Sequence, residues 1–187
     1  MELMVKGYAI QATAEFLSSD PDLRGRLPDD FVKEAVRATS AMKATEWYGR
    51  SEAIDLYAAI ARAYSSDAEA YAAFVRCGRA TAGAAIKGYL KLLLKVLTPR
   101  MFASKFPDFW SRDHQSGHAE VGVIEDKRLV LRLRDVGGFD HIGPVSAGFI
   151  DFAMEAIGMK GVEVTCTPWS LATPGPNDVE IEVRWTR

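Results

Sequence analysis

The chain has 187 residues, 26% of them charged, and a formal net charge of −2, values that suit one soluble globular domain. So balanced a charge argues against a nucleic-acid partner and gives no attraction to an anionic membrane. The two cysteines are too few for a disulfide framework, so a cytoplasmic location is predicted. No signal peptide is expected, and lysines interrupt the longest apolar stretch, residues 90–97, so no membrane span is expected either.

Helical spacing of apolar residues predicts three helices in the first third of the chain. The first covers Val5–Leu17 and ends at the run Ser18–Pro21. The second starts at Pro28, with acidic residues in its first turn. The third is expected to begin at Ser51, whose side chain would cap it.

A longer helix follows. Ser66 and Glu69 form a capping box that predicts its start, and its apolar pattern continues to Leu97. Thr98–Lys105 is expected as a short separate helix, because threonine is a good N-cap and proline fits the first helical position. One or two further turns are expected before Gly117.

One face of the long helix carries a seam of regularly spaced residues. Those at its start are small enough for a neighbouring helix to come close, and those at its end are large enough to fill a core. If the small end were uncovered, it would suit the association of two chains. The seam consists of Gly78, Ala82, Ala85, Tyr89, Leu92 and Val96.

After residue 117 the apolar period changes to two, the pattern of strands with one wet face. Two strands form a hairpin around Glu125–Lys127, a helix over Val145–Ile157 ends at a glycine, and two more strands follow. The sequence therefore predicts one α+β domain. It would be mainly helical over 1–117 and a β-β-α-β-β antiparallel sheet unit over 118–187.

Opposite charges occupy matching faces of two of these strands. Arg128, Arg132 and Arg134 share one face of the hairpin's second strand, and Glu180 and Glu182 lie on the corresponding face of the last strand. We expect cross-strand ion pairs here rather than a nucleic-acid contact.

Three histidines are candidates for acid–base or metal chemistry, because imidazole titrates near neutral pH and is the commonest metal ligand. They are His114, His118 and His141. If their loops converged they could hold a metal in an enzyme, although their spacing matches no strong motif. No catalytic residue is predicted. Cys77 and Cys166 are expected as small core residues rather than nucleophiles.

Aromatic residues gather at the junction between the helical part and the sheet unit. Such junctions are natural places for an apolar pocket with a few polar groups. A core that is packed solid is the alternative interpretation. If there is a pocket, we expect it to be lined by Phe106, Trp110, Phe149 and Trp169, with His114 or His141 as the polar contact.

Six short motifs carry a family resemblance: Val5-Lys6-Gly7, Glu46-Trp47-Tyr48, Gly78-Arg79, Leu97-Thr98-Pro99, Pro107-x-x-Trp110 and Val183-Arg184-Trp185. Together they resemble an uncharacterised family of about this length that is expanded in myxobacteria. That family is distantly similar in layout to haem-based H-NOX domains and to 4-vinyl-reductase-type domains, which bind small aromatic effectors. Trafficking-complex subunits that serve as dimeric platforms share the layout as well.

The resemblance implies cofactor ligands that this sequence lacks. An H-NOX domain carries an axial histidine on the helix before the sheet, whereas residues 89–109 contain none. Its Tyr-x-Ser-x-Arg motif, which pairs with haem propionates, is replaced by Leu131–Asp135. The 4-vinyl-reductase type carries zinc-binding cysteines before the last strand, whereas Trp169–Gly175 has none. The sequence therefore disfavours haem and structural zinc, and no cofactor is predicted.

The function predicted from these observations is that of a non-enzymatic sensory or regulatory domain in signalling. It would bind a small apolar or aromatic molecule between the late helices and the sheet. A dimeric protein-interaction module of the same fold is the first alternative, and a histidine-based metal enzyme is the second.

Overall fold

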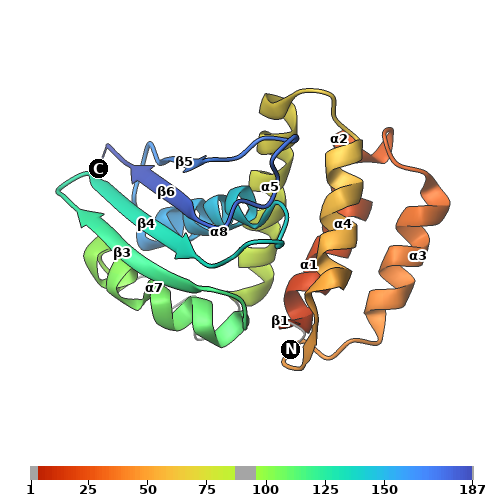
Figure 1. Cartoon of the computed structure of the whole chain (residues 1–187), viewed down its shortest axis with the longest axis horizontal. Coiled ribbons are helices and arrows are strands. Elements are labelled where there is room, and N and C mark those ends of the chain that lie inside the picture. The colour runs from red at the N-terminus through yellow and green to blue at the C-terminus, as the bar shows by residue number, and fades with distance from the viewer. Residues whose placement is uncertain (1–3, 87–95, 187) are drawn as a thin grey trace.

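The computed structural model describes residues 4–86 and 96–186. In chain order the elements are β1 (Met4–Lys6), α1 (Gly7–Ser19), α2 (Pro21–Arg24), α3 (Asp29–Ser40), β2 (Trp47–Gly49), α4 (Arg50–Arg62), α5 (Asp67–Ala85), α7 (Pro99–Asp113), β3 (His118–Ile124), β4 (Arg128–Arg134), α8 (Ile142–Ile157), β5 (Glu163–Thr167) and β6 (Val179–Arg184). Helices α1, α3 and α4 lie on one side, the larger sheet with α7 on the other, and α5 between them (Figure 1). The predicted α+β class is confirmed.

The first described residues form a strand, although a helix was expected from Val5. Val5 pairs with Tyr48 in the small antiparallel sheet of β1 and β2, so α1 starts only at Gly7. The amide of Gly7 donates to the carbonyl of Glu46, and a Cβ at Gly7 would lie 2.4 Å from the carbonyl oxygen of Lys43. This long-range pairing overrides the local helical period.

Two of the three predicted side-chain caps at helix starts are present. The Ser66 hydroxyl accepts from the amide of Glu69 at the start of α5, and Thr98 accepts from the amide of Met101 at the start of α7. The predicted Ser51 cap is wrong, because α4 begins one residue earlier and has no side-chain cap. The predicted helical run to Leu97 is wrong at its described ends, because α5 stops at Ala85 and residues 86, 96 and 97 are not helical. The part that contains Tyr89 and Leu92 of the seam, residues 87–95, lies outside the described chain.

Helix α7 is one continuous element rather than a short helix with separate turns. It runs through Pro107 and ends only at Asp113. An interior proline removes one helical hydrogen bond. The burial of Phe106 and Trp110, which are both at most 4% exposed, offsets that loss.

The larger sheet has the order β3-β4-β6-β5, with every neighbouring pair antiparallel. Its outer face carries the predicted ion pairs: Arg128 to Glu182 at 2.8 Å and Arg132 to Glu180 at 3.0 Å. Its inner face is apolar, and α8 packs on it over β5 and β6. Gly158, in the left-handed region at φ 101°, ends α8 as the sequence indicated.

The small-residue seam of α5 is covered by α8 of the same chain. A Cβ at Gly78 would lie 1.9 Å from the carbonyl oxygen of Val145, and one at Gly148 would lie 2.0 Å from that of Val75. The two helices therefore approach backbone to backbone, and Ala82 is fully buried. This contact uses the surface on which the dimer interpretation depended.

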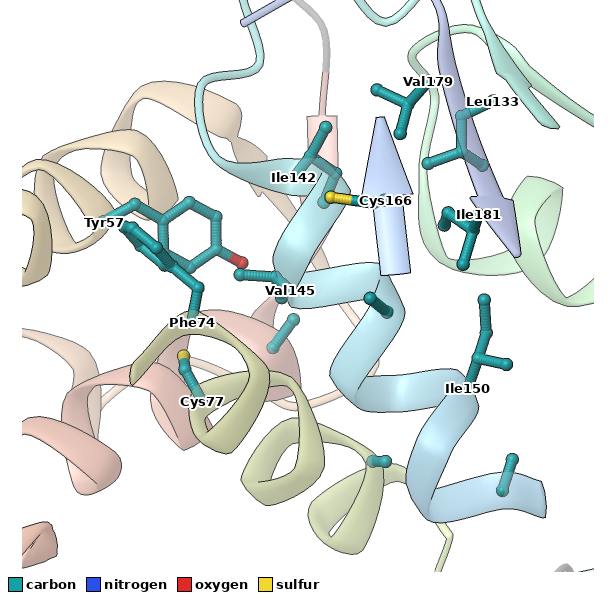
Figure 2. Close-up of a cluster of buried hydrophobic side chains, with 14 of the residues drawn as sticks. Tyr57, Phe74, Cys77, Leu133, Ile142, Val145, Ile150, Cys166, Val179 and Ile181 are labelled. Carbon is teal, nitrogen blue, oxygen red and sulfur yellow. The ribbon is translucent and has the colours of Figure 1, made fainter. Parts of the chain in front are cut away.

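Helix α8 joins the two halves of the core. Val145 points toward Tyr57 on α4, while Ile142 and Ile150 point toward the sheet (Figure 2). Cys77 and Cys166 belong to this core, and burial raises the pKa of each thiol to about 12, so both are unreactive packing residues. Among the described helices, none is both long and apolar enough to cross a membrane.

Candidate functional site

A cavity of about 50 Å³ lies where α7, α8 and the start of α1 meet. It has room for roughly three to five water-sized groups. Helices α4 and α5 complete its walls, so elements from most of the chain converge on it. Its aromatic lining residues are Tyr8, Tyr57, Phe106, Phe109, Trp110 and Phe149.

The structure divides the predicted pocket residues between two places. Phe106, Trp110, His114 and Phe149 line the cavity, whereas His141 and Trp169 do not. The rings of Phe139, Tyr57 and Phe74 fill the space between the two groups, with centroids 6.2 Å apart for each neighbouring pair.

His114 follows the last residue of α7 and is held from two sides. Its ring stacks on Trp110, with centroids 4.0 Å apart, and its backbone forms an isolated antiparallel bridge with Val5. Burial lowers its pKa to about 4, against the attraction of Asp113, so the ring is neutral at pH 7. Its Nδ1 atom is buried and has no hydrogen-bond partner among the described residues.

Asp113 brings a carboxylate to the cavity wall together with its compensating partners. The Tyr8 hydroxyl donates to Asp113 Oδ2 at 2.8 Å, and Arg112 donates to both carboxylate oxygens at 2.9 and 2.6 Å. Burial and the nearby carboxylate hold the pKa of Tyr8 well above its ordinary value, so Tyr8 stays protonated. The wall is therefore polar here, with little net charge.

A second aromatic cluster surrounds His141, the residue before α8. Its ring stacks on Phe74, with centroids 4.3 Å apart, and Trp169 meets Phe74 edge-on at 5.9 Å. The backbone amide of His141 donates to the carbonyl of Pro174, which ties the loop before β6 to α8. Burial lowers the pKa of His141 to about 4. In the described chain, neither His141 Nδ1 nor Trp169 Nε1 has a partner.

The histidines do not assemble a metal centre within the described residues. His118 is exposed at the start of β3, where its ring lies 3.2 Å from Glu120. No group of three or more His, Cys, Asp or Glu side chains suited to a metal occurs in residues 4–86 and 96–186. The described residues therefore do not form the three-histidine metal centre on which the enzyme alternative depended.

Sequence reasoning missed Tyr8, Tyr57 and Ser146 as lining residues. Tyr8 lies in an element expected as plain helix, and its partner Asp113 is 105 residues away. No local motif links them. The one available signal was the pair Asp113-His114, which marks a charged and a titratable group beside the aromatic run of α7.

No protein-family model and no curated protein matches the chain, but solved H-NOX structures match it along nearly its full length. The Fe(II) unliganded H-NOX protein from K. algicida has a TM-score of 0.66 at 11% identity, over 97% of each chain. An H-NOX protein from S. oneidensis in the Fe(II)NO ligation state has a TM-score of 0.64 at 11% identity, over 97% of this chain and 99% of that one. A third structure, solved in work on heme redox potential and porphyrin distortion, has a TM-score of 0.60 at 10% identity, over 97% of this chain and 99% of that one.

The prediction of no cofactor needs correction, because these solved structures belong to proteins described with Fe(II) and heme. Residues 89–109 contain no histidine, but α7 continues to Asp113 and His114 follows it at the cavity. A neutral imidazole is a suitable iron ligand. The cavity of about 50 Å³ is far below the roughly 300–1,000 Å³ that drug-sized ligands fill, so a porphyrin does not fit this conformation. At 10–11% identity the likeness shows the fold alone, and the fold of this chain is that of H-NOX proteins.

Proposed function

We propose that the protein is a sensory domain that binds a small, mainly apolar molecule in the cavity beside His114. The cavity itself is the observation that carries this proposal. It is lined by aromatic rings, it borders His114, whose Nδ1 has no partner among the described residues, and it lies inside a fold whose solved members include ligand-bound proteins.

The cavity volume limits the size of this molecule. An engineered cavity of about 150 Å³ binds benzene, roughly three times the space available here. The aromatic ligand expected from the sequence would therefore need the half-buried rings of Phe109 and Phe149 to move. A molecule of a few non-hydrogen atoms fits without such a change.

The position of the cavity suggests how occupancy would be sensed. His114 lies between the ligand space and the backbone of Val5, and the next amide, of Gln115, donates to the carbonyl of Met4. The hydrogen bond from Tyr8 on α1 to Asp113 on α7 links the same two parts of the chain. A ligand that binds more tightly to one arrangement of this contact shifts the population toward it.

The test is an NMR titration of ¹⁵N-labelled protein with xenon, small alcohols and small aromatic molecules. We expect shifts centred on the amides of Tyr8, His114 and Phe149. Ser146→Leu fills the cavity and should abolish them. Ser111→Leu, the same change at an exposed position on α7, should not.

A haem titration followed by absorption belongs in the same experiment. Stoichiometric haem binding that depends on His114 would replace the small molecule as the ligand. Shifts confined to surface residues, with no response to xenon, would leave the cavity without a binding function.

A further inference from the structure

We infer that the ligand of this cavity is an uncharged molecule with one hydroxyl or amide group, which pairs with His114. This rests on the proposed function and adds the chemical class of the ligand.

The charge of the lining excludes ions. None of the described lining residues is a lysine or an arginine, so an anion would meet no cation there. The one carboxylate, Asp113, is already engaged by Tyr8 and Arg112. A cation would therefore have to displace Arg112, and an anion would lie unpaired beside a carboxylate in an apolar space.

The polar groups of the lining indicate which functional group the ligand carries. His114 lines the cavity, no hydrogen bond joins its ring nitrogens to a described residue, and the hydroxyl-bearing Ser146 lies on the facing helix α8. The ring is neutral because burial lowers its pKa to about 4, so one nitrogen donates and the other accepts. Hydroxyl and primary amide groups can do both, and they therefore suit either tautomer.

Four probe molecules separate the effect of ligand charge from that of hydrogen bonding. Each has four non-hydrogen atoms, a size that the cavity holds. Acetamide and acetate share one shape but differ in charge, as do 2-propanol and protonated isopropylamine. Xenon reports the apolar space alone. Dissociation constants come from NMR titration at pH 7. We expect the two neutral probes to bind at least about tenfold more tightly than their charged counterparts.

His114→Phe tests the hydrogen bond while keeping the stack on Trp110. It should weaken acetamide and 2-propanol about tenfold, the worth of one buried hydrogen bond, and leave xenon unchanged. His118→Phe, on an exposed strand end, is the matched control and should change none of them. Loss of xenon binding in His114→Phe would mean that His114 only shapes the cavity, and it would overturn the inference.

Asp113→Asn tests the charge argument by replacing the negative charge beside the cavity with an unpaired positive one. The substitution keeps the shape and leaves Arg112 without its counter-ion beside the cavity. Acetate should then bind more tightly than to the unchanged protein. Acetate and acetamide binding equally to the unchanged protein would refute the inference while the proposed function stands. Failure of every probe, xenon included, would refute both.

Discussion

His114 and His141 share their local chemistry and differ in what lies beside them. Each is stacked on an aromatic ring, each has a pKa lowered to about 4 by burial, and each has an Nδ1 without a described partner. His114 borders a cavity, whereas His141 is covered by the loop that carries Trp169. The two histidines therefore differ in the space beside them rather than in their local chemistry, and this is why the proposed ligand site lies at His114.

The close contact of α5 with α8 holds these two regions in place, and Gly78→Ala should disturb both most strongly. The new Cβ would lie 1.9 Å from the carbonyl oxygen of Val145, so the helices must separate. We expect a loss of roughly 3 kcal/mol in the free energy of unfolding, measured with urea. Gly83→Ala on the same helix is the control, because its Cβ meets nothing closer than Phe152 at 3.9 Å. It should be neutral or stabilising by up to about 1 kcal/mol.

Acid should destabilise the protein through both histidines. Because each folded-state pKa, about 4, lies below the unfolded value of 6.5, the unfolded chain binds more protons between these values. The stabilisation is complete above pH 6.5 and is lost as the pH falls toward 4, by about 2 kcal/mol per histidine at pH 5. Urea denaturation between pH 7.5 and 5 measures the slope. His114→Phe and His141→Phe should each remove about half of it, and an unchanged slope in either variant would contradict that residue's assignment.

The two clusters should respond differently to the loss of an indole N–H. Trp110 Nε1 donates to the carbonyl of Ser116 at 3.0 Å, whereas no partner of Trp169 Nε1 is described. Trp110→Phe should therefore cost about 1–2 kcal/mol more than Trp169→Phe. Thermal and urea unfolding of both variants checks the difference. Equal losses would mean that Trp169 has a hydrogen-bond partner in solution.

A change on the outer sheet face should leave both regions as they are. Arg132 pairs with Glu180 at 3.0 Å on a partly exposed surface. Arg132→Gln should cost about 0.5 kcal/mol or less, and only at low salt. Amide shifts near His114 and His141 should stay unchanged, and movement at either histidine would show that the outer face is coupled to the core.

The parts of the fold that sequence predicted are those set by local pattern. Alternating residues placed the four strands of the larger sheet, and Ser66 and Gly158 mark helix ends as expected. The small sheet was missed because the pairing of Val5 with Tyr48 is made across 43 residues and leaves no local trace.

The candidate site was predicted in part for the same reason. Phe106, Trp110 and His114 lie on or beside one helix, so their spacing brings them together. Trp169 and His141 were assigned to the same pocket, but the packing of α5 on α8 places Phe74 against them instead. Haem was disfavoured because residues 89–109 contain no histidine and the Tyr-x-Ser-x-Arg motif is absent. His114 lies just beyond that range, at the residue that follows α7.

The span of the cavity lining has a consequence for the making of the protein. Its walls run from Tyr8 to Phe149, so the first and last contributors are separated by most of the chain. During synthesis the early helices emerge long before α8 does. A nascent chain on the ribosome therefore lacks this cavity until α8 has emerged and docked against α5, and the proposed ligand would bind only after that step.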